Sequence, residues 1–325
     1  MPALLEVNSL TTTFRTTRGL LTAVDGISFN LDKEEVIGLV GESGSGKSIT
    51  SRSIMGLIPH PPGTVKGSIR LEGRELIGQN QRAWQKVRGE HIAMVFQDPM
   101  TSLNPVYTVG EQVAETLRFH KKIDNHQALV ETTHLFQRVG LPDPEANLNS
   151  FPHQLSGGMR QRVMIAMAIA CAPQILIADE PTTALDVTIQ AQILDLLREL
   201  NQERGMGLLL ITHDLGVVAE ICQRVMVMYA GRIMEQTAVE AIFTRPMHPY
   251  TIGLIESRPD LEKRKGRLQQ IAGSPPDLTN LPSGCPFHPR CTWVRERCRA
   301  ERPLLRELQA GHLVACHFAE EVKLG

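Results

Sequence analysis

Short, almost unbroken apolar runs recur along the chain and are separated by amphipathic stretches of helical character. Five runs are expected to be buried strands: EVIGLV (35–40), IAMVF (92–96), QILIAD (174–179), LLLIT (208–212) and VMVMY (225–229). They lack alternating polar residues, which is typical of strands covered on both faces. Helical patterns such as residues 188–203 lie between them. Because strand and helix alternate, we predict an α/β fold with a mainly parallel sheet.

Two regions break this alternation. Residues 98 to about 157 are rich in turn residues and then helical, without a strong strand pattern, so we expect a helical insertion there. After about residue 245 Pro and Gly become dense, and we expect a small, loop-rich, separate unit. The predicted domains are therefore residues 1–245, with a helical subdomain at about 98–157, and an extension over 246–325.

Composition and charge exclude several classes of protein. The 325 residues are 42% hydrophobic and 21% charged, with a formal net charge of −1. This balance fits a soluble globular protein and lacks the basic excess of a nucleic-acid binder, so no nucleic-acid partner is expected. The start of the chain does not resemble a secretory signal, and the longest apolar stretch is interrupted by Pro173 and Gln174. We expect a cytosolic chain that can still dock on membrane proteins.

A phosphate-binding motif follows the first predicted strand. GESGSGKS (41–48) matches G-x-x-x-x-G-K-[ST] and lies between a predicted strand and a predicted helix. The alternative is a glycine-rich turn that matches by chance, and the strand before the motif disfavours it. The glycines let backbone N–H groups face a polyphosphate, Lys47 would reach the β- and γ-phosphates, and Ser48 would bind Mg²⁺. The expected nucleotide contacts from this segment are Gly41, Ser43, Gly44, Ser45, Gly46, Lys47, Ser48 and Ile49.

The predicted strand within ILIADE (175–180) ends in two carboxylates. Asp179, at the strand end, would hold the Mg²⁺ water shell, and Glu180 would polarise an attacking water. Two solvated acids at a strand end would be the alternative, but the phosphate-binding loop upstream favours the catalytic interpretation.

The motif LSGGMRQR (155–162) indicates the protein class. Together with GESGSGKS, FQDP (96–99), ILIADEP and THD (212–214), it resembles the ATP-binding cassette of ABC transporters, over residues 1 to about 245. The resemblance implies a P-loop NTPase cassette with a RecA-like core and a helical subdomain, followed here by a small loop-rich domain that contains cysteines. It also implies an ATPase that uses Mg²⁺.

The same resemblance implies roles for residues outside the loop. Gln97 is expected to sense Mg²⁺ and the lytic water, and to help ligate the ion beside Ser48 and Asp179. His213 is expected to contact the γ-phosphate. Phe14 is the candidate for stacking on adenine, with a plain core position as the alternative.

A cassette of this family holds only half of each ATP site. Ser156, Gly157 and Gly158 resemble the signature motif, which binds ATP held by the opposite cassette. Residues 183–186, which end at Asp186, resemble the D-loop that crosses the dimer interface. The resemblance therefore implies a second, homologous ATPase subunit.

Longer segments narrow the branch of the family. Residues 97–112, 152–170, 178–194 and HPYTIGL (248–254) strongly resemble ATPase subunits of dipeptide and oligopeptide importers. That branch implies a different second ATPase, two membrane permeases and an external binding protein, assembled at the cytoplasmic face of a bacterial inner membrane. Peptide import is predicted, and nickel chelates, glutathione or an exporter role are the alternatives.

Four of the six cysteines lie near the end of the chain: Cys285, Cys291, Cys298 and Cys316. A cytosolic location disfavours disulfides, and the spacing lacks both the paired C-x₂₋₄-C of zinc sites and the ferredoxin runs. From the residues alone, ordinary thiols and a zinc site assisted by His288 or His317 stay open. The importer resemblance implies a [4Fe–4S] cluster on the four cysteines, with zinc as the alternative.

Overall fold

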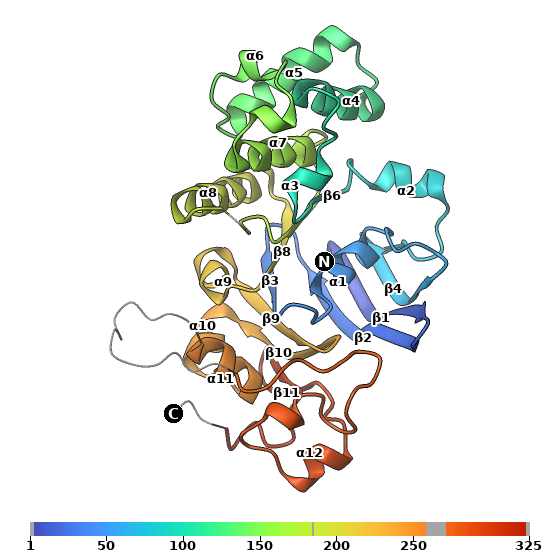
Figure 1. The fold of residues 1–325 in the computed structure, drawn as a ribbon, viewed down its shortest axis with the longest axis vertical. Helices are drawn as coiled ribbons and strands as arrows, with labels where there is room; N and C mark the ends of the chain where they lie inside the picture. The colour runs from blue at the N-terminus through green and yellow to red at the C-terminus, as the bar shows by residue number, and fades with distance from the viewer. Residues whose placement is uncertain (1–2, 184, 258–270, 323–325) are drawn as a thin grey trace.

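The computed structural model describes residues 3–183, 185–257 and 271–322, and its centre is an eight-stranded sheet (Figure 1). The strand order is β11-β12-β10-β9-β3-β8-β7-β6. Five neighbouring strands run parallel and match the five predicted from the apolar runs. They are β9 (Arg224–Tyr229), β3 (Val36–Val40), β8 (Gly207–Thr212), β7 (Ile175–Asp179) and β6 (Ile92–Val95). The predicted parallel α/β core is confirmed.

A second, antiparallel sheet covers one side of this core and was not predicted. Its order is β2-β1-β4-β5, with bounds β2 (Gly19–Leu31), β1 (Leu5–Thr16), β4 (Gly63–Leu71) and β5 (Arg74–Glu75). One apolar cluster joins Leu5 and Val24 of this sheet to Ile37 and Leu39 of β3. Helix α1 (Lys47–Ile54) contributes Ile54 to the same cluster, and α2 (Gln81–Val87) contributes Trp84.

The insertion between β6 and β7 is helical, as predicted, and residues 98–157 contain no strand. Its elements are α3 (Pro99–Ser102), α4 (Val109–Lys121), α5 (Asn125–Arg138), α6 (Pro144–Asn147), the 3₁₀ turn η1 (Pro152–Gln154) and the start of α7 (Gly157–Ile169). Thr108, Asp124 and Ser156 cap the N-termini of the longer helices with their side chains. These helices lie at the end of the molecule opposite the C-terminal extension (Figure 1).

The C-terminal extension is loop-rich, as expected, but it is joined to the central sheet. Strand β12 pairs with β10, so that Glu235 lies opposite Val314, and β11 pairs with β12. Cys285 and Phe287 share an apolar cluster with Tyr229 of β9. The extension therefore buries part of its apolar residues against the sheet and does not stand apart as a separate unit. The domain boundary at residue 245 stays a prediction.

The remaining helices flank the sheet and the extension. The helix predicted at residues 188–203 is observed as α8 (Val187–Arg204). The other elements of this half are α9 (Leu215–Ile221), β10 (Arg232–Ala238), α10 (Val239–Thr244), α11 (Pro249–Glu256), the 3₁₀ turn η2 (His288–Arg290), α12 (Glu296–Ala300), β11 (Arg306–Gln309) and β12 (His312–Val314).

Candidate functional site

The predicted phosphate-binding loop connects β3 to α1. Gly46 caps α1 with φ of 110°, and a Cβ there would lie 2.4 Å from the carbonyl oxygen of Ala23, so only glycine fits. The Lys47 Nζ donates hydrogen bonds to the carbonyl oxygens of Gly41 (2.8 Å) and Glu42 (3.0 Å). Burial lowers the pKa of this ammonium, and three nearby carboxylates act in the opposite direction. The lysine is thus held inside the loop, where an anion would compensate its charge.

Ser48 and Asp179 lie together at the start of α1 and the end of β7. The Ser48 hydroxyl donates to Asp179 Oδ1 over 3.1 Å, and the Ser51 hydroxyl contacts Oδ2 at 3.4 Å. Asp179 is 2% exposed, and burial raises the pKa of its carboxyl. Hydroxyl and carboxylate oxygens are the ligands Mg²⁺ prefers, so this pair suits the predicted ion and its water shell.

Glu180 is the centre of a second polar group. Gln97 Nε2, Thr183 Oγ1 and His213 Nδ1 lie 3.1, 2.8 and 3.4 Å from the same oxygen, Glu180 Oε2. The three come from the ends of β6, β7 and β8, where parallel strands present ligand sites. Glu180 itself has φ of 49°, a left-handed conformation that non-glycine residues adopt only under constraint. The structure thus brings three of the predicted site residues, Glu180, Gln97 and His213, to one place together with Thr183.

An open cavity of about 480 Å³ lies over the loop and is of a size typical for small-ligand sites. Its lining is Phe14, Thr16, Leu21, Ala23, Ser43, Gly44, Gly46, Lys47, Ser48, Ile49, Gln97, Glu180 and Leu278. Phe14 therefore lines the cavity, in agreement with the prediction that it stacks on adenine. The Ser45 hydroxyl is buried without a hydrogen-bond partner in the described part of the chain, and Ser45 is not among the residues that line the cavity.

Several lining residues were missed from the sequence. Leu21 and Ala23 belong to the antiparallel sheet that the sequence did not predict, and Leu278 comes from the C-terminal extension. No motif marks them, because each supplies only an apolar surface. The signal that could have indicated β2 is the alternation of apolar and polar residues in ISFNL (27–31), which forms the second part of the strand.

The signature residues lie away from this cavity. Ser156 caps α7 by accepting the Met159 N–H, and a Cβ on Gly158 would lie 2.8 Å from Ile189 Cγ2. Neither these residues nor Gly157 is among the described residues that line the cavity over the loop. The structure therefore places the predicted signature residues apart from the cavity over this chain's own loop.

The predicted D-loop is partly described. Asp186 is exposed and caps α8 by accepting the Ile189 N–H over 2.9 Å, and Val187 beside it is 84% exposed. Ala184 lies outside the described residues. Asp186 does not line the cavity in the part of the chain described here, so it too faces elsewhere.

The four C-terminal cysteines surround one small cavity. Cys285, Cys291, Cys298 and Cys316 all line it, with His248 and aromatic residues between them. Burial raises the pKa of Cys285 to about 12 and that of Cys316 to about 11. Across the described ranges, no three His, Cys, Asp or Glu side chains are grouped so that they could hold a single metal ion.

The two histidines considered as substitute zinc ligands are engaged with backbone. His288 Nδ1 lies 3.0 Å from the Cys285 carbonyl oxygen, and His317 Nε2 lies 3.0 Å from that of Glu301. The other two cysteines, Cys171 and Cys222, are not among the described residues that line this cavity, although Cys222 packs against the apolar cluster that contains Cys285. The structure therefore brings the four predicted cysteines to one place without forming a compact single-ion site.

Residues 24–183 match the ABC transporter family, and residues 234–298 match the family described as "Oligopeptide/dipeptide transporter, C-terminal region". The chain is 49% identical over 322 residues to the oligopeptide transport ATP-binding protein AppD of Bacillus subtilis, covering 99% of this chain and 98% of that protein. It is 49% identical over 321 residues to OppD of Haemophilus influenzae, covering 99% of each. Among solved structures, a dimeric ATP-binding cassette in a post-hydrolysis state with ADP and Pi is 27% identical, with a TM-score of 0.66 over 72% of this chain and 98% of that one.

Proposed function

Because this chain belongs to the ABC transporter family of ATP-binding proteins, we propose that it energises the import of di- and oligopeptides across a bacterial cytoplasmic membrane. As a family member it is an ATPase whose hydrolysis is coupled to transport. We propose peptides as the substrate because residues 234–298 match the C-terminal region of oligopeptide and dipeptide transporters. Nickel chelates and glutathione are the alternative cargoes, and an exporter role is the more distant one.

The roles proposed for the catalytic residues follow from the geometry around Glu180. Glu180 lines the cavity over the loop and its Oε2 is held by Gln97, Thr183 and His213, so the carboxylate is placed to accept a proton from an attacking water. Lys47 and the amides of the loop bind the phosphates. Ser48, Asp179 and Gln97 would hold Mg²⁺, which when bound neutralises phosphate charge.

A second cassette is proposed to complete the site. The signature residues Ser156, Gly157 and Gly158 do not line the cavity over this chain's own loop, and Asp186 and Val187 are exposed beside them. An exposed apolar side chain next to a helix N-terminus suits a partner surface more than solvent. The dimeric state of the related solved cassette supports this arrangement. We propose that the partner is a different, homologous ATPase subunit.

Membrane permeases are proposed to dock on the helical insertion. Met100, Val106 and Tyr107 are 62%, 71% and 54% exposed and follow directly after Gln97, the residue that contacts Glu180. Exposed apolar side chains that lie close together in the chain suit an interaction surface. None of the helices that the structure describes has the length and apolar character needed to span a bilayer. We therefore place the chain at the cytoplasmic face of the inner membrane, held there by two permeases that receive cargo from an external binding protein.

A [4Fe–4S] cluster is proposed at the cysteine-lined cavity. In such a cluster each thiolate binds a different iron, so four cysteines around one space suit it better than a single ion, whose ligands must converge on one point. The apolar lining and the loop-rich chain around it agree with a group that stabilises this part of the fold when bound. Zinc is the alternative occupant.

Reconstitution of the whole transporter tests the function. The chain would be assembled with its partner ATPase, both permeases and the binding protein in proteoliposomes, and ATP hydrolysis would be measured with different cargoes. We expect stimulation and uptake with di- or oligopeptides. Stimulation by nickel chelates or glutathione in place of peptides would contradict the proposed cargo, and net export would contradict the direction.

A further inference from the structure

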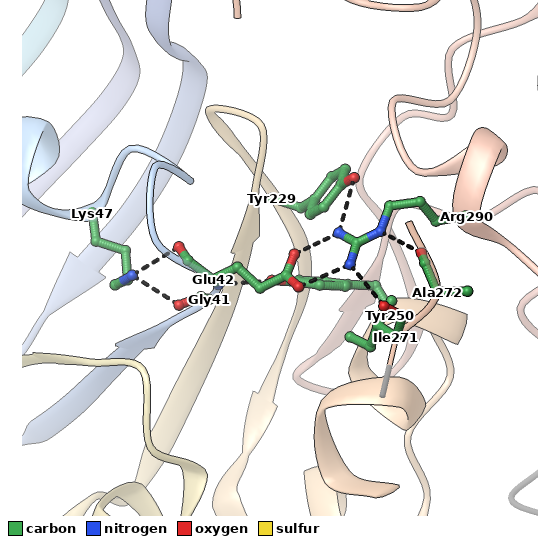
Figure 2. Close-up of polar contacts among 8 residues, drawn as sticks. All are labelled: Gly41, Glu42, Lys47, Tyr229, Tyr250, Ile271, Ala272 and Arg290. Carbon is green, nitrogen blue, oxygen red and sulfur yellow. Dashed lines mark hydrogen bonds and ion pairs between the residues drawn. The ribbon is translucent and has the colours of Figure 1, made fainter. Parts of the chain in front are cut away.

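One residue of the phosphate-binding loop, Glu42, is held by the C-terminal extension (Figure 2). The Arg290 guanidinium forms two hydrogen bonds with the Glu42 carboxylate, at 2.6 and 2.9 Å. The Glu42 N–H donates to the Tyr250 hydroxyl over 2.8 Å. The Glu42 carbonyl oxygen accepts from Lys47 Nζ. Every polar group of Glu42 is therefore engaged, two by the extension and one by the phosphate-binding lysine.

At the contact with Glu42, the arginine is buried and the carboxylate stays 26% exposed. Arg290 is only 5% exposed at its side chain, and its Nε also donates to the Ala272 carbonyl oxygen over 2.9 Å. Its guanidinium lies 5.8 Å from the ring centre of Tyr229, and Tyr250 is fully buried. Two parallel N–H···O bonds between a planar guanidinium and a carboxylate define an orientation as well as a distance. The contact thus orients the Glu42 carboxylate relative to Arg290.

The contacts of Arg290 and Tyr250 with Glu42 are connected to the nucleotide site through the backbone of the loop. Gly41 and Glu42 supply the two carbonyl oxygens that hold the Lys47 ammonium, and the N–H of Glu42 is the one fixed by Tyr250. A loop whose backbone is already ordered loses less conformational entropy when it binds a ligand. The extension also places Leu278 in the wall of the same cavity.

We infer that Arg290 and Tyr250 are positioning residues for ATP: acting through Glu42, they hold the phosphate-binding loop of the cassette in its binding conformation. This inference rests on the nucleotide site proposed above and gives the C-terminal extension a part in it. The competing interpretation is a tether that only attaches the extension to the cassette. A tether would affect thermal stability and leave the affinity for ATP unchanged.

A double-mutant cycle separates these interpretations. Arg290→Gln, Glu42→Gln and the double variant would be made in the full chain, and the Kd for Mg-ATP measured by calorimetry together with Tm. We expect each single change to raise Kd about tenfold, and the double change to raise it no further, because both remove one interaction. In the complete transporter, KM for ATP should rise while kcat at saturating ATP is retained.

Two further variants control for folding. Tyr250→Phe keeps the buried ring and removes only the hydroxyl, so it should shift Kd in the same direction by a smaller factor. Arg297→Gln breaks an exposed ion pair with Glu301 in the same extension and should leave Kd unchanged. A lower Tm with unchanged Kd in the Arg290 and Glu42 variants, or additive effects in the double variant, would overturn the inference. A wild-type chain that bound no ATP would instead overturn the proposed function.

Discussion

Gln97 donates a hydrogen bond to Glu180 across 3.1 Å, although 83 positions separate the two residues in the sequence. The contact exists because β6 and β7 are parallel neighbours, so their carboxyl ends open on the same edge of the sheet. It joins the residue next to the exposed apolar surface of the insertion, Met100, Val106 and Tyr107, to the carboxylate proposed to activate water. The hydrogen bond thus links the segment that carries these exposed side chains to Glu180.

Replacing Glu180 with Gln should stop hydrolysis while ATP still binds. The amide keeps the shape of the side chain but cannot accept the proton of the attacking water, so turnover should fall about a hundredfold to ten-thousandfold. Phosphate release by the complete transporter and ATP binding by the full chain measure the two effects. Glu199→Gln, at an exposed position of α8, is the matched control. Near-normal turnover of the Glu180 variant would refute this role.

Replacing Ser156 with Ala should separate helix capping from ATP binding in trans. Ser156 and Asp124 are both N-cap residues whose side chains accept a backbone N–H, at 3.3 and 2.9 Å. Their alanine variants should each lose about 1 kcal/mol of stability. Only the Ser156 variant should also lose ATPase activity in the assembled transporter, because only this residue lies in the signature motif. Equal ATPase activity of the two variants would show that Ser156 acts only as a helix cap.

Replacing Val106 with Glu should weaken the attachment to the permeases. A charge placed in an apolar interface would cost about 2 kcal/mol, or about thirtyfold in affinity. Co-purification with the permeases measures the loss, and ATP binding by the free chain should not change. Leu304→Glu, which alters a residue 75% exposed in the C-terminal extension, serves as the control. Unaltered assembly of the Val106 variant would show that permeases dock elsewhere.

Replacing Cys298 with Ser should remove the proposed cluster and loosen the extension. After anaerobic purification, wild type should contain iron and acid-labile sulfide, and the variant should lack both and melt at a lower temperature. Cys171→Ser, which changes a cysteine outside the cavity, should retain the metal. Stoichiometric zinc without iron in the wild-type chain, or a metal-free folded extension, would rule out the cluster.

The amino-acid sequence by itself determined the parallel core and the motifs along it. Apolar runs without polar alternation were long enough to identify five buried strands, and the glycine, lysine and carboxylate positions at their ends follow local chemical requirements. Such features depend on residues close together in the chain. The nucleotide loop, Asp179 and Glu180 could therefore be predicted before any contact was known.

Only the tertiary structure decided which distant residues meet. Gln97 and His213 reach one oxygen of Glu180 because the strands before them, β6 and β8, are the two neighbours of β7 in the sheet. The pairing of β12 with β10 depends on a sheet edge that becomes available once the core has formed. The antiparallel sheet packs on the core through a shared apolar cluster and forms no strand pair with it. Arg290 lies 248 positions from Glu42, and no local pattern distinguishes it from the other arginines of the extension. Its partner is set by packing, because a buried guanidinium must find a carboxylate wherever the fold places one.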